Sequence, residues 1–431
     1  MDKWAKRIRL LLLTAVTGIV MGVVSMLFLR SLGFVTNLRQ RQPLFIALLP
    51  LVGFGTVFLY TRFGKNAQKG NNLIIESVHQ STHVPLRMGL FTFVCTILTH
   101  LAGGSAGREG TAVQIGGTVA NVLGDRFRLN HSNRRILVMA GISAGFGSVF
   151  GVPLAGAFFG MEMCFVGSLG YEALLPCFIA SFTADYVTRA LGIIHAEHVI
   201  HAVPAIGWYP VLIVVLASIV FGVLGRLFAV GIRALKLFYA RLVSRPLLRV
   251  LVGSAVVLVV MLGLRAVAFA GLSDWMIGSG FAGKVHWYDP LLKLLLTVLT
   301  LGAGFQGGEV TPLFDIGASM GGWIGQVAHV SPSLLAATGM IAVFGCAANT
   351  PLATLMIGFE MFGVGALPYE VIAVFVSYYV SGYSGIYGAQ RITIGVHDTV
   401  GKRHERTLDA VGNQSLTGHL IGKLAKKIKS Q

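Results

Sequence analysis

Charged residues are scarce in this chain of 431 residues, since Asp, Glu, Lys and Arg together make up only 12% of it. A soluble globular domain has roughly a quarter of its residues charged. Hydrophobic residues reach 55%, and so few charges cannot cover a surface exposed to water. The composition therefore predicts an all-α polytopic membrane protein that crosses the bilayer several times.

Acidic residues are scarcer than basic ones, which gives a net charge of +17. Such a charge can indicate nucleic-acid binding, but here Lys and Arg gather between or beyond the apolar runs. The basic groups lie at 3–9, 39–41, 126–135, 226–249 and 402–429. This is a positive-inside pattern, so we expect a multi-pass protein of the cell inner membrane with both termini in the cytoplasm and no nucleic-acid partner.

Cysteine is also rare, and catalytic or metal-binding motifs are missing. The chain lacks HExxH and P-loop sequences, and its twelve histidines show no ligand spacing, so we expect neither a metal nor a cofactor. The four cysteines stand inside apolar runs without CxxC spacing, which favours small core residues over disulfides: Cys95, Cys164, Cys177 and Cys346.

Apolar runs recur along almost the whole chain, but several are too short for a perpendicular span. Leu291–Leu301, for example, is well below the roughly 20 residues that a perpendicular helix needs. Such runs fit broken or tilted helices, whose free backbone must face protein or water. The basic start of the chain is followed by a long apolar run without a clear cleavage site, so we expect a retained first helix.

The chain contains an internal repeat. The segment from Gly141 to Met163 matches the segment from Gly339 to Met361, 198 positions later, with Gly, Pro-Leu-Ala, Gly and Glu-Met in one register. The predicted architecture is therefore two related halves, which we expect to be inverted, with the substrate site between them near the bilayer midplane. The expected parts are 1–196 and 211–395 for the halves, 197–210 for the linker and 396–431 for a basic cytoplasmic tail. Residues 419–430 of this tail are either a basic amphipathic piece on anionic lipid or a frayed end.

A glycine-rich stretch places a carboxylate among apolar segments. Glu109 lies in the fifteen residues from Gly103 to Gly117, six of which are glycine. An ionisable group at that depth lines a cavity, pairs with a partner or carries a proton, while the structural alternative is a glycine-rich helix crossing with a capping Glu. Glu309 lies in a similar stretch 200 positions later. Glu162 and Glu360 occupy matching repeat positions, which favours a paired architectural role.

Two further positions can supply hydrogen-bond donors. Asn71 stands at the start of an apolar helix. This position is equally consistent with a helix cap and with an amide N–H₂ that donates a hydrogen bond to an anion. Tyr387 ends a tyrosine cluster, which is typical of an interfacial aromatic belt, whereas a single hydroxyl that donates to an anion is the sharper alternative.

Taken together, these motifs resemble the CLC family of anion channels and anion/proton antiporters. They are Gly-Arg-Glu-Gly-Thr at 107–111, the two Pro-Leu-Ala segments and Gly-Gly-Glu-Val-Thr-Pro at 307–312. The resemblance covers nearly the whole transmembrane chain. It implies that Glu109 is the gating glutamate and that Asn71 and Tyr387 stand at the anion-coordinating positions. It also implies a homodimer with one pathway per subunit.

The departures from the family pattern resemble its fluoride/proton antiporter branch. Asn71 replaces a serine, Val310 replaces a phenylalanine, and Met163 stands where chloride/proton antiporters carry an inner proton glutamate. The resemblance therefore implies a fluoride exporter that couples anion efflux to proton influx. The anion-binding residues that it implies are Asn71, Gly107, Arg108, Gly110, Val310, Thr311 and Tyr387, with Glu109 and Glu309 as the working carboxylates. Arg108 is expected to pair with an acid elsewhere.

Physical chemistry suggests how the two fluxes would couple. Ionised Glu109 competes with the anion for the same donors, whereas protonated Glu109 is neutral and can swing away with its proton. Fluoride is strongly hydrated, so donors at helix N-termini and from Asn71, Thr311 and Tyr387 must replace its water. Glu309 would shape the site or serve the inner proton step.

Two other function classes stay open at this stage. A CLC chloride/proton antiporter or passive anion channel is the nearer one. An intramembrane serine hydrolase is the rival from a different class, because Ser105 and Ser143 lie in GxSxG sequences and Ser384 in a Gly-x-Ser-Gly sequence. The elbow pattern requires a preceding strand and His and acid partners, which the sequence does not offer. We therefore expect a secondary active transporter and no enzyme.

Overall fold

The computed structural model describes residues 3–80, 82–393 and 406–412. Its described part is built mainly from helices, eight before and eight after the connection at 191–207, and a short one near the end. The first eight are α1 (Lys3–Arg41), α2 (Leu49–Leu59), α3 (Asn71–His79), α4 (Leu86–Leu101), α5 (Glu109–Arg126), α6 (His131–Phe150), α7 (Pro153–Glu162) and α8 (Leu174–Ala190). The second eight are α9 (Trp208–Leu242), α10 (Pro246–Gly263), α11 (Trp275–Phe281), α12 (Asp289–Ala303), α13 (Val310–Val327), α14 (Pro332–Ala348), α15 (Pro351–Phe362) and α16 (Leu367–Ser381).

Short elements complete the described chain. Short 3-10 helices lie at Pro43–Leu48, Lys65–Lys69, Tyr171–Ala173 and Val267–Phe269, and a short π-helix lies at Tyr60–Gly64. A small sheet joins β1 (Phe165–Val166), β2 (Arg391–Ile392) and β3 (Arg406–Thr407) in that order, and α17 (Leu408–Gly412) follows it. β1 and β2 pair in parallel, while β2 and β3 pair antiparallel. Because these strands come from distant parts of the sequence, the sheet fastens the end of the described chain to the first half.

Four helical segments are long and apolar enough to cross a membrane, by length and composition. They are Trp4–Arg41, Pro43–Lys69, Trp208–Leu242 and Pro246–Gly263. The remaining apolar helices are shorter, such as the ten residues of α7. The predicted mixture of long and interrupted helices and the all-α membrane architecture are therefore confirmed, while the retention of the first helix stays a prediction.

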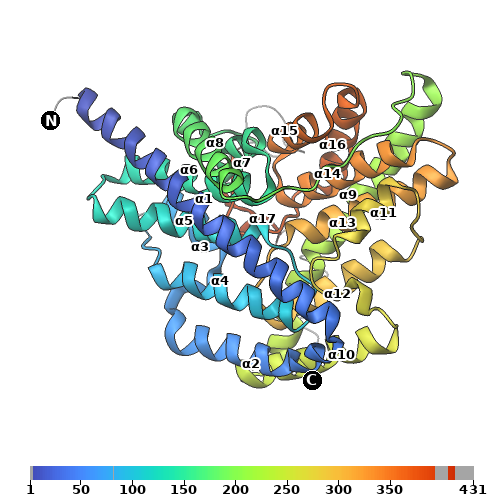
Figure 1. The fold of residues 1–431 in the computed structure, drawn as a ribbon, viewed down its shortest axis with the longest axis horizontal. Helices are drawn as coiled ribbons and strands as arrows, with labels where there is room; N and C mark the ends of the chain where they lie inside the picture. Colours follow the sequence, from blue (N-terminus) through green and yellow to red (C-terminus); the bar gives the residue numbers. More distant parts are fainter. Residues whose placement is uncertain (1–2, 81, 394–405, 413–431) are drawn as a thin grey trace.

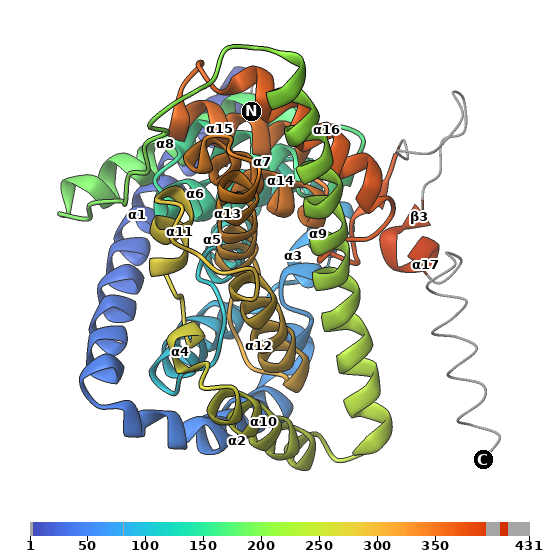
Figure 2. The ribbon, with the colours of Figure 1, turned by 90° about the vertical axis from the view of Figure 1, so that its right-hand side faces the viewer.

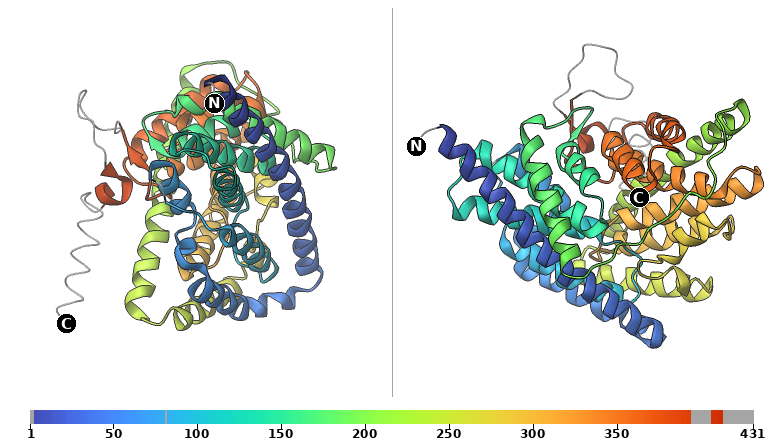
Figure 3. Two further views of the ribbon diagram at one scale, coloured as in Figure 1. Left: turned by 90° about the vertical axis from the view of Figure 1, so that its left-hand side faces the viewer. Right: turned by 45° about the horizontal axis from the view of Figure 1, so that its top comes forward.

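The two sets of helices are arranged around a common centre (Figure 1). In Figure 2, α1 and α9 flank the molecule on opposite sides, with α7, α8, α15 and α16 at one end and α2 and α10 at the other. The left view of Figure 3 shows the same frame from the opposite side. Equivalent helices of the two sets thus take equivalent places, as an internal repeat predicts.

A reciprocal exchange of carboxylates ties the two sets together. Glu162, at the end of α7, accepts hydrogen bonds from the backbone N–H groups of Leu352 at 3.1 Å and Ala353 at 2.7 Å, in the first turn of α15. Glu360, in α15, accepts from Leu154 at 3.1 Å and from the next residue at 2.9 Å, in the first turn of α7. Each acid caps the other's helix and interacts favourably with its dipole. The predicted architectural pairing of these two residues is confirmed.

Matching helix ends extend the same symmetry. Gly151 follows the last residue of α6 with φ 81°, and Asn349, 198 positions later, follows the last residue of α14 with φ 56°. Both residues take the left-handed conformation that closes a helix, for which Gly and Asn are the common choices. The four cysteines are buried and free, as expected of small core residues.

We expect the carboxylate caps to contribute measurably to stability. Glu162→Gln should lower the free energy of unfolding by about 2 kcal/mol, because hydrogen bonds to a charged group are worth roughly 1.5–3 kcal/mol. Thermal unfolding in detergent, followed by tryptophan fluorescence, measures the change. Glu172→Gln is the control, since Glu172 is 44% exposed in a surface ion pair and such pairs are worth about 0–1 kcal/mol. Equal effects of the two changes would contradict the capping role.

The connection between the halves is an extended segment, 191–207, and α9 begins at Trp208, inside the expected linker. The division of the chain into two domains and a tail stays a prediction. Of the expected tail, 396–431, the structure describes only 406–412, and the segment 419–430 lies outside the described residues.

Candidate functional site

The N-termini of α5 and α13 meet head to head at the centre of the molecule. The backbone N–H of Gly107 donates to the carbonyl of Gly308 at 2.7 Å, and the N–H of Gly308 donates to the carbonyl of Gly107 at the same distance. The two helices lead away from this bridge on opposite sides (Figure 1). Helix N-termini carry partial positive charge, so their meeting point attracts anions.

Glu109 is the first residue of α5, and its side chain is only 1% exposed. Its Oε2 atom accepts hydrogen bonds from the backbone N–H of Thr311 at 3.1 Å and from the Thr311 hydroxyl at 2.5 Å. The N–H of Arg108 adds a longer contact of 3.4 Å. The carboxylate therefore lies on the donors at the start of α13.

These donors would serve a small anion equally well. A carboxylate oxygen and a halide are both compact acceptors that need N–H or O–H donors once water is removed. In the structure the Glu109 oxygen occupies these donors. Since the donors of Thr311 cannot hold both, the geometry makes the carboxylate and the anion mutually exclusive there.

Three buried polar atoms near this site have no hydrogen-bond partner among the described residues. They are Asn71 Oδ1, Glu309 Oε2 and the Tyr387 hydroxyl. Both carboxylates, Glu109 and Glu309, lie within electrostatic reach of the Tyr387 hydroxyl. Because buried polar groups are normally satisfied, such a group of open atoms indicates a place for a ligand or water.

Glycine is required where these side chains approach the backbone. A Cβ on Gly110 would lie 3.0 Å from Glu309 Oε2 and 3.4 Å from Asn71 Nδ2. A Cβ on Gly107 would lie 2.8 Å from the Thr311 hydroxyl. The glycines thus let the first turns of α5 and α13 come within contact of each other's side chains.

The structure brings together the residues that the sequence singled out, with one correction. Arg108 was expected to pair with an acid elsewhere, but its Nε atom lies 3.3 Å from Oε1 of neighbouring Glu109. The two residues are adjacent, since Arg108 occupies the N-cap position directly before Glu109, the first residue of α5. Val310 is fully buried in the first turn of α13, where it packs in the core. The functional roles assigned to these residues stay predictions.

A second asparagine holds the tyrosine loop. The Oδ1 atom of Asn72 accepts a hydrogen bond from the N–H of Ala389 at 3.0 Å, two residues after Tyr387. Asn71 and Tyr387 therefore keep a fixed relation, although they are more than 300 positions apart in the sequence.

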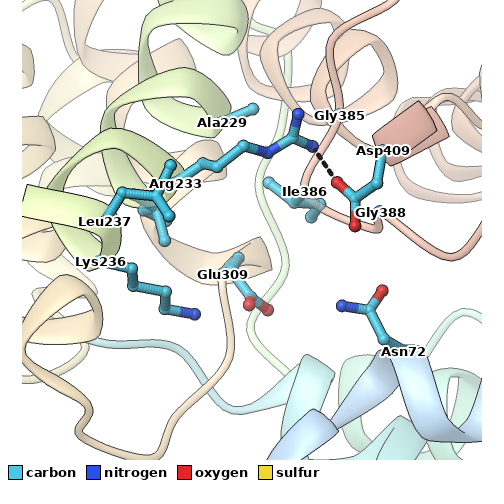
Figure 4. A pocket seen from close by; sticks show the side chains of 11 residues that line it. Asn72, Ala229, Arg233, Lys236, Leu237, Glu309, Gly385, Ile386, Gly388 and Asp409 are labelled. Carbon is cyan, nitrogen blue, oxygen red and sulfur yellow. Dashed lines mark ion pairs between the residues drawn. The ribbon is translucent and has the colours of Figure 1, made fainter. Parts of the chain in front are cut away.

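Cavities reach the site from two sides. One, of about 390 Å³, is lined by Arg108, Glu109, Thr311 and part of the connection 191–207. The other, of about 410 Å³, is lined by Glu309 and by residues of α9 and the C-terminal segment (Figure 4). Each carboxylate thus faces a different cavity, and the meeting point of α5 and α13 separates them.

His195 lines the first cavity from the connection outside the helices. Burial, and to a smaller extent the charges of Arg189 and Arg108, lowers the pKa of His195 to about 4. The imidazole is therefore neutral at physiological pH, and Arg108 is the positive group beside Glu109 in this cavity.

The serines of the hydrolase-like sequences do not form a nucleophile site. The Ser105 hydroxyl bonds Thr297 at 2.9 Å, and the Ser143 hydroxyl donates within its own helix to Met139 at 3.1 Å. Ser384 donates to the carbonyl of Ser381 at 2.8 Å. No described strand leads into any of the three, so the elbow geometry is not built.

The sequence did not lead us to expect one buried ion pair. Lys293 of α12 and Asp315 of α13 are both fully buried, with Lys293 Nζ 3.3 Å from Asp315 Oδ2. Lys293 also donates to the carbonyls of Gly271 and Leu272 and to the Ser273 hydroxyl, at 2.9, 3.0 and 3.1 Å. A lysine in the middle of the apolar run Leu291–Leu301 was the signal, because such a charge requires a partner.

Comparison with known proteins shows similarity along nearly the whole chain. The family model described as "Voltage gated chloride channel" matches residues 52–382. A "Chloride/fluoride channel protein" of Pseudomonas syringae pv. tomato is 43% identical over 395 residues, which are 90% of this chain and 87% of that protein. An "H(+)/Cl(-) exchange transporter ClcA" of Citrobacter koseri is 28% identical over 388 residues, 82% of this chain and 80% of that protein.

Solved structures match the fold as well. A crystal structure of a CLC-type fluoride/proton antiporter superposes with a TM-score of 0.88 at 36% identity, covering 91% of this chain and all of that one. A slow cyanobacterial Cl⁻/H⁺ antiporter superposes with a TM-score of 0.75 at 20% identity, covering 97% and 98%, which shows the shared fold.

Proposed function

Because the chain belongs to the voltage-gated chloride channel (CLC) family, we propose that it is a secondary active transporter that exports fluoride in exchange for protons. The observation that carries this proposal is the Glu109 carboxylate seated on the Thr311 donors. The Glu109 carboxylate and fluoride cannot occupy those donors at the same time. Because protonation releases the carboxylate, the movement of fluoride is linked to the movement of a proton.

The proposed cycle follows from charge and space. Fluoride enters from the cavity lined by Glu309. The Tyr387 hydroxyl and the Asn71 amide N–H₂ are its first side-chain donors, and Thr311 becomes a third donor once Glu109 has left it. Glu109 takes up a proton from the cavity on its own side, becomes neutral and leaves the donors free. Fluoride then passes to that cavity, and the proton moves the other way when Glu109 ionises again.

The surroundings of the transporter follow from the charge pattern and the relatives. We place it in the inner membrane of a bacterium, with both termini and the cavity beside Glu309 on the cytoplasmic side. We also propose a homodimer, for which similarity to the family is the support.

Flux from proteoliposomes tests the function. Purified protein should release fluoride from loaded vesicles and alkalinise the medium in step, because protons enter the vesicles as fluoride leaves. Fluoride, chloride and external pH are recorded together. A chloride/proton antiporter would move chloride as fast as fluoride with protons, and a passive channel would move anions with no proton uptake. Either result would contradict the proposal.

The second carboxylate gives a separate prediction. Glu309→Gln should slow coupled fluoride/proton exchange by a factor of about one hundred or more, because a glutamine cannot pass a proton and such transfers contribute about 10²–10⁴. Initial rates of fluoride release and pH change in the same vesicles measure it. Glu197→Gln, an exposed acid of the connection, is the control. Unchanged rates and unchanged fluoride/chloride selectivity would reduce Glu309 to scaffolding.

A further inference from the structure

The described end of the chain, 406–412, is docked against the entrance of the cavity that leads to Glu309. β3 pairs with β2, with Arg391 opposite Thr407, and the N–H of Leu408 donates to the carbonyl of Gln390 at 2.9 Å. Leu408 is fully buried in a small apolar cluster with Val166 and Ile392. This anchoring fixes the position of the next residue, Asp409.

Asp409 lies between the tyrosine loop and α9. Its N–H donates to the carbonyl of Gly388 at 3.0 Å, and a Cβ on Gly388 would lie 2.1 Å from Asp409 Oδ2. On the other side its Oδ1 atom lies 2.9 Å from Nη2 of Arg233. The carboxylate is thus held against the loop that carries Tyr387 while it neutralises a cation of the cavity wall.

Two cations of α9 line this cavity. Arg233 and Lys236 are three residues apart, which places them on the same face of the helix. Figure 4 shows the Lys236 ammonium directed toward Glu309 and the Arg233 guanidinium toward Asp409. Lys236 has no hydrogen bond or ion pair with any residue that the structure describes.

Asp409 also marks the border between two spaces. Asp409 lines the cavity of about 410 Å³ that Glu309 also lines. It also lines a neighbouring cavity of about 460 Å³, together with Asn72 and Gly388. Its side chain is 58% exposed, and that of Arg233 is 35% exposed, so both groups are within reach of dissolved ions. An anion that enters the cavity therefore meets Arg233 already occupied by a carboxylate.

From this arrangement we infer that Arg233 and Lys236 form a recruiting site for small monovalent anions at the cavity entrance, and that Asp409 is a tethered carboxylate that competes with the anion for Arg233. The inference rests on the proposed function and adds the step before the central site. Cations on a cavity wall attract anions, and the carboxylates of Asp409 and Glu309 on the same wall oppose that attraction. The occupancy of Arg233 by Asp409 would set how much anion the transporter accepts from this face.

Inverted membrane vesicles expose this face and provide the test. Initial fluoride uptake is measured against external fluoride, with an imposed proton gradient, for the wild type and Asp409→Asn. We expect Asp409→Asn to lower the half-saturating fluoride concentration about threefold, and Arg233→Gln to raise it about threefold, as partly exposed charges act through local ion concentration. Maximal rates should stay within about twofold of the wild type, because the central site is intact.

The double variant shows whether Asp409 acts through Arg233. Arg233→Gln with Asp409→Asn should resemble Arg233→Gln alone, while Arg233→Lys should keep the wild-type value. Glu172→Gln, which removes the exposed partner of Arg135 at the same 2.9 Å, is the matched control. In about 0.5 M of a salt whose ions are not transported, the half-saturating fluoride concentrations of the variants should move closer to the wild-type value, since salt screens exposed charges. In right-side-out vesicles all variants should behave alike.

Two failures are distinguishable. Suppose that the wild type takes up fluoride and that Asp409→Asn leaves the half-saturating concentration unchanged or raises it. Asp409 then has only a structural role, and the inference is wrong. If the wild type moves chloride and not fluoride, the proposed function falls, and the same concentration curves measured with chloride still decide whether Asp409 competes at the entrance.

Discussion

Glu109→Gln is expected to abolish fluoride-driven proton movement, with a loss of about 10³-fold or more, because it removes the proposed proton-carrying group that lies on the Thr311 donors. Glutamine is also neutral, so it competes weakly with an anion for those donors. Anion flux without proton movement is therefore expected to persist or rise. Simultaneous recording of external pH and anion release from proteoliposomes measures both.

A conservative change separates charge from shape. Glu109→Asp keeps a titratable group but withdraws it from the Thr311 donors, so coupling should weaken without disappearing. Thr311→Val keeps the shape of residue 311 and removes its hydroxyl, which bonds Glu109 at 2.5 Å. Proton coupling that survives in Glu109→Gln would overturn the role proposed for this carboxylate.

Lys293→Met is expected to destabilise the protein by about 3–5 kcal/mol, since it leaves Asp315 as an unpaired charge in a fully buried position. It also removes the donor that satisfies the carbonyls of Gly271 and Leu272. The midpoint of thermal unfolding in detergent and the recovery of monodisperse protein after mild heating measure the loss.

The double change Lys293→Met with Asp315→Leu tests the reason for this loss. If the unpaired carboxylate is the main cost, replacing both groups by apolar side chains of similar size should restore much of the stability. Arg249→Gln, at a partly exposed position of α10, is the control. A double variant as unstable as Lys293→Met would instead assign the loss to the carbonyls.

The sequence predicted most of what depends on spacing. The repeat placed Glu162 and Glu360 in matching positions, and the structure turns that match into a pair of reciprocal helix caps. The glycine-rich stretches likewise matched Glu109 with Glu309, and both carboxylates lie at the head-to-head meeting of α5 and α13. The spacing of the repeat and the positions of small residues depend on backbone geometry, so these features can be predicted from a single sequence.

Contacts between distant side chains were not predictable in the same way. Arg108 has several acids within the chain as possible partners, and only the fold shows that it turns back to Glu109. Asp409 belongs to a polar stretch that reads as an ordinary tail, and its position beside Arg233 depends on the pairing of β2 with β3. Such contacts depend on how separate helices are oriented, which neither composition nor spacing records.

The exchange between Glu162 and Glu360 bears on how a chain of this kind could arise. The contact is self-complementary, since each half offers the same acid and receives it at the same helix start. A half-length ancestor could have satisfied both contacts by pairing with a second copy of itself, as an isologous interface allows. After two such copies were joined end to end, each half would have been able to change independently. The first half then carries Glu109 and its cavity, and the second carries Glu309 and the opposite cavity.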